Sequence, residues 1–248
     1  MKSMIQVKNL KKFYRVGDEK VKALNGIDLT IERGEICCIL GTSGSGKSTL
    51  LNMLAGLEPP TRGEIWIDSL PIHSMGEKAL TDFRRESVGF VFQSYNLIAS
   101  LPAWANVAMP LEFRGTSKKE RENLARKMLA AVNLANRMDH TPSEMSGGQQ
   151  QRVGIARAFV HRPKLVFADE PTGNLDSKTT IEVMELMVSM ARQHRQTLII
   201  VTHDPEIADY ADRIIHLIDG KIHSDRKNQP CFYTDFRNTN INSNNEGA

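Results

Sequence analysis

A glycine-rich turn between a strand and a helix constrains this chain more than any other stretch of its sequence. Four apolar residues, 37–40, run into Gly41-Thr42-Ser43-Gly44-Ser45-Gly46-Lys47-Ser48, which fits G-x-x-x-x-G-K-[ST] at each fixed position. Apolar residues then follow 3.6-residue helical spacing, with Gly56 as a stop. Small loop residues let backbone N–H groups point inward, and the helix adds the positive end of its dipole. The turn therefore predicts a polyphosphate site in which Lys47 reaches the β- and γ-phosphates and Ser48 ligates Mg²⁺.

A second apolar run ends in two carboxylates. Residues 165–168 read as a buried strand, and Asp169-Glu170 follow directly. Such a strand end suits a magnesium–nucleotide site, with Asp169 holding the metal through water and Glu170 polarising the attacking water as a general base. Taken alone, these residues could equally be a strand followed by a solvated acidic turn. The phosphate loop upstream favours the nucleotide site.

Strand and helix patterns alternate along the chain. Short strands are expected in the first ~35 residues, and apolar runs at 165–168 and 198–201 predict further strands, while Asp219-Gly220 predicts a hairpin turn. Residues 94–160 are mostly helical in pattern, and Leu124, Met128, Leu129 and Val132 are expected on one helix face. The expected fold is α/β: a phosphate-loop NTPase core with a mainly parallel sheet, an N-terminal antiparallel β subdomain and an inserted α-helical lobe.

A nucleotide-binding domain is expected to span residues 1–224, with the helical subdomain at about 94–160. Residues 225–248 are rich in Asn, which disfavours a packed element, so this tail is expected to be disordered. The alternative is that Cys231, Phe232, Tyr233 and Phe236 dock on the body.

Composition excludes several classes. The 248 residues are 40% hydrophobic and 25% charged, as in ordinary soluble proteins, and a net charge of +3 without a basic block gives no support to nucleic-acid binding. No run approaches the ~20 apolar residues of a membrane span, and residues 1–6 lack a signal-peptide core, so a cytoplasmic location is expected. Cys37 and Cys38 are expected to be buried strand residues rather than metal ligands, because no His or Cys partners stand at ligand spacing.

The segment Met145-Ser146-Gly147-Gly148-Gln149-Gln150-Gln151-Arg152 resembles the LSGGQ signature of ATP-binding-cassette (ABC) ATPases. Further family elements stand in the family's order, over about residues 4 to 224. Alone, each has a simpler explanation: Tyr14 as an exposed strand aromatic, Gln93 as a loop residue, Ser146 as a helix cap, or His203 as a strand end. Their joint order favours the resemblance.

The resemblance implies a role for each matched position. The catalytic residues would be Glu170, His203, Gln93 and Lys47. The metal would be held by Ser48, Gln93 and Asp169. The nucleotide would be contacted by Tyr14 at the adenine, by Gly41, Thr42, Ser43, Gly44, Ser45, Gly46, Lys47, Ser48 and Thr49 at the phosphates, and by Ser146, Gly147, Gly148, Gln149 and Asp176 across a dimer.

The resemblance also implies partners. In the family two cassettes pair head to tail on ATP, so that the signature of one faces the γ-phosphate held by the other. Detailed similarity to the lipoprotein-releasing and macrolide-exporter subfamily implies a separate membrane permease, with the chain peripheral on the inner face of the membrane. Met145, Thr42 and Ala105 depart from the usual Leu, Pro and Glu, and the last of these leaves the partner's identity open.

Two rival classes and one local alternative stand beside this interpretation. A soluble ABC ATPase of translation or DNA repair usually has two cassettes or an interrupting coiled coil, and a phosphate-loop kinase lacks the signature and the switch His. In the lobe, Trp104, Met109, Leu111 and Phe113 could form a docking surface for the permease or fill the lobe's own core.

Overall fold

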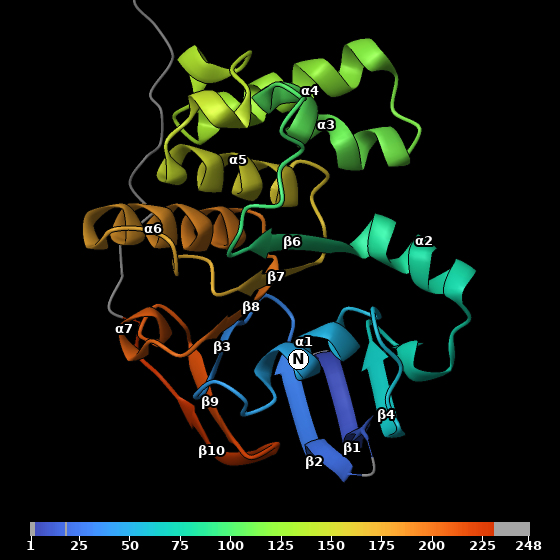
Figure 1. The fold of residues 1–248 in the computed structure, drawn as a ribbon. Coiled ribbons are helices and arrows are strands. Elements are labelled where there is room, and N and C mark those ends of the chain that lie inside the picture. The colour runs from blue at the N-terminus through green and yellow to red at the C-terminus, as the bar shows by residue number, and fades with distance from the viewer. Residues whose placement is uncertain (1–2, 18, 231–248) are drawn as a thin grey trace, which may run out of the picture.

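Two β-sheets organise the part of the chain that the computed structural model describes, residues 3–17 and 19–230 without the side chain of Val16 (Figure 1). A four-stranded antiparallel sheet has the order β2-β1-β4-β5, and a six-stranded sheet has the order β10-β9-β3-β8-β7-β6. The strands are β1 (Ser3–Val16), β2 (Glu19–Glu32), β3 (Ile36–Leu40), β4 (Arg62–Ile67), β5 (Leu70–Pro71), β6 (Val88–Phe92), β7 (Leu165–Asp169), β8 (Thr197–Thr202), β9 (Arg213–Ile218) and β10 (Lys221–Lys227). The helices are α1 (Lys47–Leu54), α2 (Glu77–Ser87), α3 (Ala103–Phe113), α4 (Lys118–Ala131), α5 (Gly147–Phe159), α6 (Ser177–Gln193) and α7 (Pro205–Ala208), with short 3₁₀ turns at Ile72–Ser74, Ala135–Arg137 and Pro142–Glu144.

The six-stranded sheet is parallel from β9 to β6, and only β10 runs antiparallel. Its central strands are apolar at successive positions because both faces are covered, as is usual for parallel sheets. Cys37 and Cys38 are both buried and belong to the apolar clusters of opposite faces. The expected α/β fold, with its antiparallel N-terminal sheet, is confirmed.

The two faces of this sheet carry different elements. One face packs against α5 and α6 and, beyond them, against α3 and α4 of the lobe. The other face packs against α1 and the antiparallel sheet. Figure 1 shows the lobe stacked above β6 and β7, with α1 and the antiparallel sheet below. The helix after the phosphate loop and the helix after the signature therefore lie on opposite faces.

The hairpin at Asp219-Gly220 forms as expected. Both residues have positive φ, +48° and +69°, and connect β9 to β10. The polar tail was expected to begin at residue 225, but β10 continues to Lys227, because residues 225–227 stay paired with β9. Asp225 also forms a two-pronged ion pair with Arg213 at 2.6 Å. Residues 231–248, with Cys231 and the aromatic residues of the tail, lie outside the described residues.

The lobe has its own apolar interior. On α4 the buried residues are Ala125 and Leu129, and Val132 is buried just after the helix, while Leu124 is exposed. Three of the four expected residues thus lie on the inner face, because half-buried Met128 packs against the same cluster as Leu129 and Val132. Leu124 is the exception, and Ala125 is buried in its place.

His161 stands where the lobe meets the core. Its Nε2 lies 3.1 Å from the Val88 carbonyl oxygen, while Arg114 donates to the carbonyl of His161 at 2.7 Å. Burial, aided by the Arg114 charge, lowers the pKa of His161 from 6.5 to about 4. The neutral imidazole is therefore the form that fits the folded protein.

Lowering the pH should destabilise the fold through His161. In the unfolded chain His161 binds a proton below about pH 6.5, whereas in the folded chain it stays neutral down to about pH 4. The contribution of the neutral imidazole to the free energy of unfolding is fully present above the unfolded pKa. Between the unfolded and the folded pKa it falls by roughly 1.4 kcal/mol for each pH unit that the pH is lowered. His161→Gln keeps a side-chain N–H for Val88 but cannot titrate. Urea unfolding at about pH 7 and about pH 5 should show the wild type losing about 2 kcal/mol more than the variant. Equal losses would contradict this account.

Candidate functional site

The carboxyl ends of four parallel strands meet at one edge of the six-stranded sheet. Phe92, Asp169 and Val201 are paired across β6, β7 and β8, and Leu40 pairs with Thr202. The residues that follow these strand ends are Gln93, Glu170, His203 and Gly41. The sheet register thus brings together four motifs that lie far apart in the sequence.

The phosphate loop bends back on itself before α1. Gly44 and Gly46 have φ of +79° and +102°, and Ser45 N–H donates to the Thr42 carbonyl at 3.2 Å. Gly46 stands at the N-cap of α1 and offers no side-chain cap, so the first N–H groups of the helix have no side-chain acceptor there. An anion is the natural acceptor for such groups.

Close backbone packing holds this loop in place, although the motif itself does not predict these contacts. A Cβ on Gly46 would stand 2.5 Å from the Ala23 carbonyl oxygen of β2, and one on Gly41 would stand 2.4 Å from that of Leu217. Gly220 of the hairpin donates its N–H to the Ser45 carbonyl at 3.0 Å. The loop is therefore clamped between β2 and the β9–β10 hairpin, and only glycine fits at these approaches.

Lys47 is buried within the loop that it follows. Its Nζ donates to the carbonyls of Gly41 and Thr42 at 2.7 and 2.9 Å, which holds the ammonium over the loop. Its charge also acts on Asp169. Burial raises the pKa of Asp169, the neighbouring Glu170 charge raises it further, and Lys47 opposes the rise.

Asp169 fits a cation. Its Oδ1 is buried and has no hydrogen-bond partner among the described residues. A buried carboxylate oxygen without a donor is strongly disfavoured unless a positive ion or water reaches it. Carboxylate, hydroxyl and amide oxygens are the donors that Mg²⁺ prefers, so the Asp169, Ser48 and Gln93 set suits this ion.

Glu170 is held by the neighbouring strand. Its φ is +45°, and its N–H donates to the Val201 carbonyl at 2.9 Å. The carboxylate accepts from Thr202 Oγ1 at 3.2 Å and lies 3.0 Å from His203 Nδ1. Because a carboxylate only accepts, Nδ1 carries the proton, and Nε2 of the exposed His203 ring is free of this contact. A strained backbone that aims a carboxylate from the strand end is typical of functional positions.

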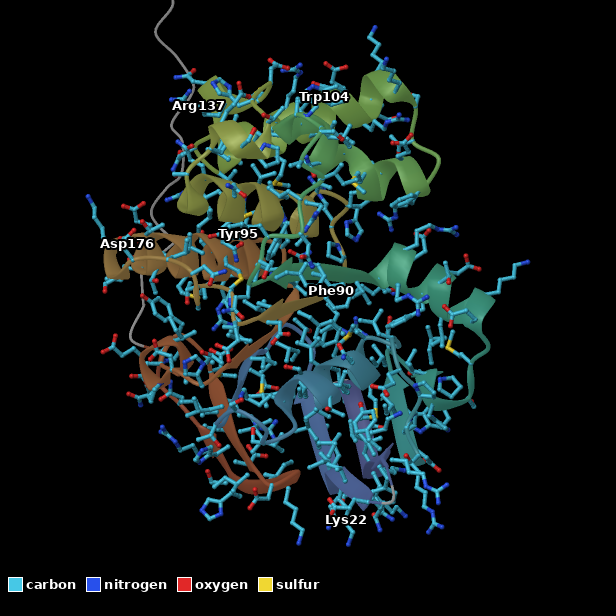
Figure 2. All side chains as sticks on the ribbon, in the orientation of Figure 1. Lys22, Phe90, Tyr95, Trp104, Arg137 and Asp176 are labelled. Atoms are coloured by element: carbon cyan, nitrogen blue, oxygen red, sulfur yellow. The ribbon has the colours of Figure 1, made fainter. Side chains whose placement is uncertain are left out.

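Gln93 begins a loop that is fixed at both ends. Its carbonyl accepts from the Asn174 side chain at 3.0 Å, and a Cβ on Gly173 would lie 2.7 Å from its Nε2. Tyr95 and Asn96 then take positive φ, +61° and +48°, and Arg157 of α5 donates to both carbonyls. Tyr95 lies where this loop passes between the sheet and the lobe helices (Figure 2). Arg157 and Tyr95 were not among the expected site residues, since no local pattern links them.

Ser146 caps α5 in the described structure. Its side chain accepts from Gln149 N–H, and the Gln149 side chain accepts from Ser146 N–H at 3.0 Å, a reciprocal capping box. Cβ atoms on Gly147 and Gly148 would lie 2.8 Å from the Tyr95 hydroxyl and 2.5 Å from Thr179. The signature glycines are thus packed between the Gln93 loop and α6.

Two further expected site residues, Asp176 and Tyr14, lie at the N-cap of α6 and on β1, and the Tyr14 side chain is hydrogen-bonded to Thr49 of α1. Asp176 is exposed and caps α6 through Thr179 N–H at 3.0 Å, at the outer end of that helix (Figure 2). Tyr14 is half-buried on β1, with its hydroxyl 2.7 Å from Glu58. No described contact joins Ser146 or Asp176 to the phosphate loop of the same chain.

The apolar stretch of the lobe is divided between the core and the surface. Leu111 is only 5% exposed and belongs to the core, whereas Phe113 is 66% exposed. Trp104 and Met109 are half-buried, and Trp104 lies in the lobe with Arg126 over its ring. Figure 2 shows Trp104 far from Lys22 of the antiparallel sheet.

Asn106, next to Ala105, organises the preceding loop. The buried side chain accepts from Ile98 N–H at 2.7 Å and donates to the carbonyls of Ile98, Leu101 and Pro102. The loop that leads into α3 is therefore shaped by Asn106.

Comparison with known proteins agrees with this geometry. The family model for ABC transporters matches residues 24–173. The lipoprotein-releasing system ATP-binding protein LolD of Geobacter metallireducens is 44% identical over 225 residues, which is 91% of this chain and 100% of LolD. The macrolide export ATP-binding/permease protein MacB of Rhodopirellula baltica is 44% identical over 224 residues, 90% of this chain and 33% of MacB.

A solved structure shares the whole described fold. The dimeric post-hydrolysis state of the cassette MJ0796 of Methanocaldococcus jannaschii, bound to ADP and Pi, aligns with a TM-score of 0.85 at 41% identity, over 91% of this chain and 99% of that one. Within residues 3–17 and 19–230, none of the helices has the length and apolar character that crossing a membrane requires. The chain therefore belongs to the ABC transporter family, as an ATP-binding and ATP-hydrolysing subunit.

Proposed function

We propose that MgATP binds at the carboxyl edge of the six-stranded sheet and that Glu170 is the general base of its hydrolysis. The observation that carries this is the Glu170 carboxylate, aimed from a strand end and bonded to Thr202 and His203 beside the phosphate loop. A carboxylate so placed can accept a proton from a water molecule that attacks the γ-phosphate. Nε2 of His203 is then available to the same phosphate.

The residues around this base are proposed to bind the phosphates, the adenine and the metal ion. The loop Gly41–Ser48 and Lys47 bind the phosphates, and Tyr14 stacks on the adenine. Asp169, Ser48 and Gln93 would hold Mg²⁺, which neutralises charge on the phosphate oxygens when bound. The buried, partnerless Oδ1 of Asp169 supports this assignment.

The complete site requires a second copy of the chain. α1 and α5 pack on opposite faces of the sheet, so the capped N-terminus of α5 cannot serve the phosphate loop of its own chain. In the proposed head-to-tail dimer, Ser146, Gly147, Gly148 and Gln149 contact the γ-phosphate of the partner's ATP, and Asp176 lies at the contact. The dimeric structure of MJ0796 supports the pairing of two cassettes.

The dimer would act on a separate membrane permease, at the cytoplasmic face of the cell membrane. The similarity to LolD and to the cassette part of MacB favours an export or force-transmitting system. Within the lobe, exposed Phe113 with half-buried Met109 and Trp104 is the proposed contact for the permease.

Glu170→Gln should stop hydrolysis but not binding. The amide keeps the shape of the side chain but cannot take the proton of the attacking water, so turnover should fall roughly 100-fold or more. ATP affinity, measured by calorimetry, should stay within about threefold of the wild type, a difference below 1 kcal/mol. A variant that hydrolyses ATP at the native rate would refute the base assignment.

Dimer formation should depend on ATP. Glu170→Gln should elute as a monomer without nucleotide and as a dimer with MgATP in size-exclusion chromatography with light scattering. Adding Lys47→Ala to this variant should abolish the dimer, because the phosphates lose a charge-assisted partner and the ATP that joins the subunits binds weakly. A dimer that forms equally well without nucleotide would argue against a composite site.

Replacing Phe113 should separate permease binding from catalysis. Phe113→Asp puts a charge on a mostly exposed side chain, so the thermal stability and basal ATPase of the isolated subunit should change little. Co-purification with its membrane permease should be lost. Leu111→Asp is the matched control, since a buried unpaired charge should destabilise the lobe by several kcal/mol (about 3 or more). A Phe113→Asp chain that still assembles would place the permease contact elsewhere.

A further inference from the structure

Tyr14 is tied to the chain that leaves the phosphate-loop helix. Its hydroxyl donates to Glu58 Oε2 at 2.7 Å, and Glu58 follows shortly after α1. The segment is itself bonded to β1, because Thr61 Oγ1 accepts from Phe13 N–H at 3.1 Å and Thr61 N–H donates to the Lys11 carbonyl at 2.9 Å. The distance between the strand and the Glu58 carboxylate is therefore set by the two hydrogen bonds of Thr61 to the β1 backbone.

The second oxygen of Glu58 holds a cation above the same ring. Lys12 Nζ lies 2.8 Å from Glu58 Oε1 and donates to the Pro59 carbonyl at 2.9 Å. The Lys12 ammonium also lies over the Tyr14 ring, 5.2 Å from its centroid. One carboxylate thus fixes both the edge of the ring and the cation that covers one of its faces.

This arrangement prepares the ring for stacking. A hydrogen bond at the hydroxyl restricts rotation of the side chain, and a cation over one face directs a planar ligand to the other. Burial raises the pKa of Tyr14, and its bond to Glu58 adds to the rise, so the hydroxyl stays a donor. Burial also acts to raise the pKa of Glu58, but hydrogen bonds from Lys12 and Tyr14 outweigh it and lower the pKa, so the carboxylate stays an acceptor.

We propose that Glu58 is a positioning residue for the nucleobase: with Lys12 it holds the Tyr14 ring as a one-sided platform and so sets how much the base contributes to nucleotide affinity. The proposal rests on the proposed role of Tyr14 at the adenine. Glu58 acts through the ring and not on the phosphates, so its effect should vanish when either the base or the ring is absent.

The test compares a ligand with a base to one without. ADP and inorganic tripolyphosphate are titrated by calorimetry into the full chain, its variants Glu58→Ala, Glu58→Gln and Tyr14→Ala, and the double variant. Glu58→Ala should weaken ADP binding roughly 3- to 10-fold, a part of the stacking contribution of an aromatic platform, and leave tripolyphosphate binding unchanged. The ADP affinity of Glu58→Gln should lie between those of the wild type and Glu58→Ala. Its amide oxygen still accepts a hydrogen bond from the Tyr14 hydroxyl, but the side chain lacks the charge that holds Lys12. Glu64→Ala, an exposed carboxylate on β4, is the matched control and should change neither affinity.

The double variant decides whether Glu58 works through the ring. In the Tyr14→Ala background, Glu58→Ala should cause no further loss of ADP affinity. The proposal is overturned if Glu58→Ala still weakens ADP binding in the Tyr14→Ala background. It is also overturned if Glu58→Ala weakens tripolyphosphate binding to the same extent, or if Glu58→Ala leaves the ADP affinity unchanged. If Glu58→Ala does not fold, the near-isosteric Glu58→Gln carries the same comparison. Unchanged ADP affinity in Tyr14→Ala would instead remove the adenine role of Tyr14, which distinguishes the two failures.

Discussion

The pairing of β7 with β8 is the contact on which the rest of the site depends. It sets Asp169 opposite Val201, and the same register continues to β6 on one side and β3 on the other. Glu170 leaves the sheet in a left-handed conformation that its N–H bond to Val201 secures. A slip of the strands by one residue would turn the carboxylate to the wrong face and bury a charge in an apolar cluster. The register of the sheet therefore sets the position of Glu170, the proposed base.

The same sheet separates the two halves of the proposed composite site. The phosphate loop and α1 are fixed on one face, and the signature helix on the other, where its glycines pack on Tyr95 and Thr179. The Gln93 loop is the described connection that touches both the strand edge and α5, through Arg157. The Gln93 loop thus links the strand edge to the signature helix by hydrogen bonds.

The sequence predicts the local parts of this architecture better than their assembly. The strand–loop–helix around Lys47, the strand before Asp169 and the hairpin at Asp219 follow from short-range chemistry, since small residues, apolar runs and turn residues act within a few positions. The Ala23 carbonyl beside Gly46, the Arg157 bonds and the Glu58 bond to Tyr14 join residues far apart, and no periodicity encodes them. The extent of β10 does not follow from the sequence either, because its last residues are polar and exposed and are held by pairing with β9 rather than by apolar alternation.

Two neighbouring carboxylates receive opposite environments, and this difference supports their proposed roles. The Glu170 carboxylate accepts hydrogen bonds from Thr202 and His203, and these bonds hold it at the carboxyl edge of the sheet. Asp169 is half-buried, and its buried Oδ1 has no hydrogen-bond partner among the described residues. Burial together with the Glu170 charge raises the pKa of Asp169, and the Lys47 charge opposes this rise. A group in that state gains most from a divalent cation, which favours its charged form and relieves the repulsion between the two carboxylates.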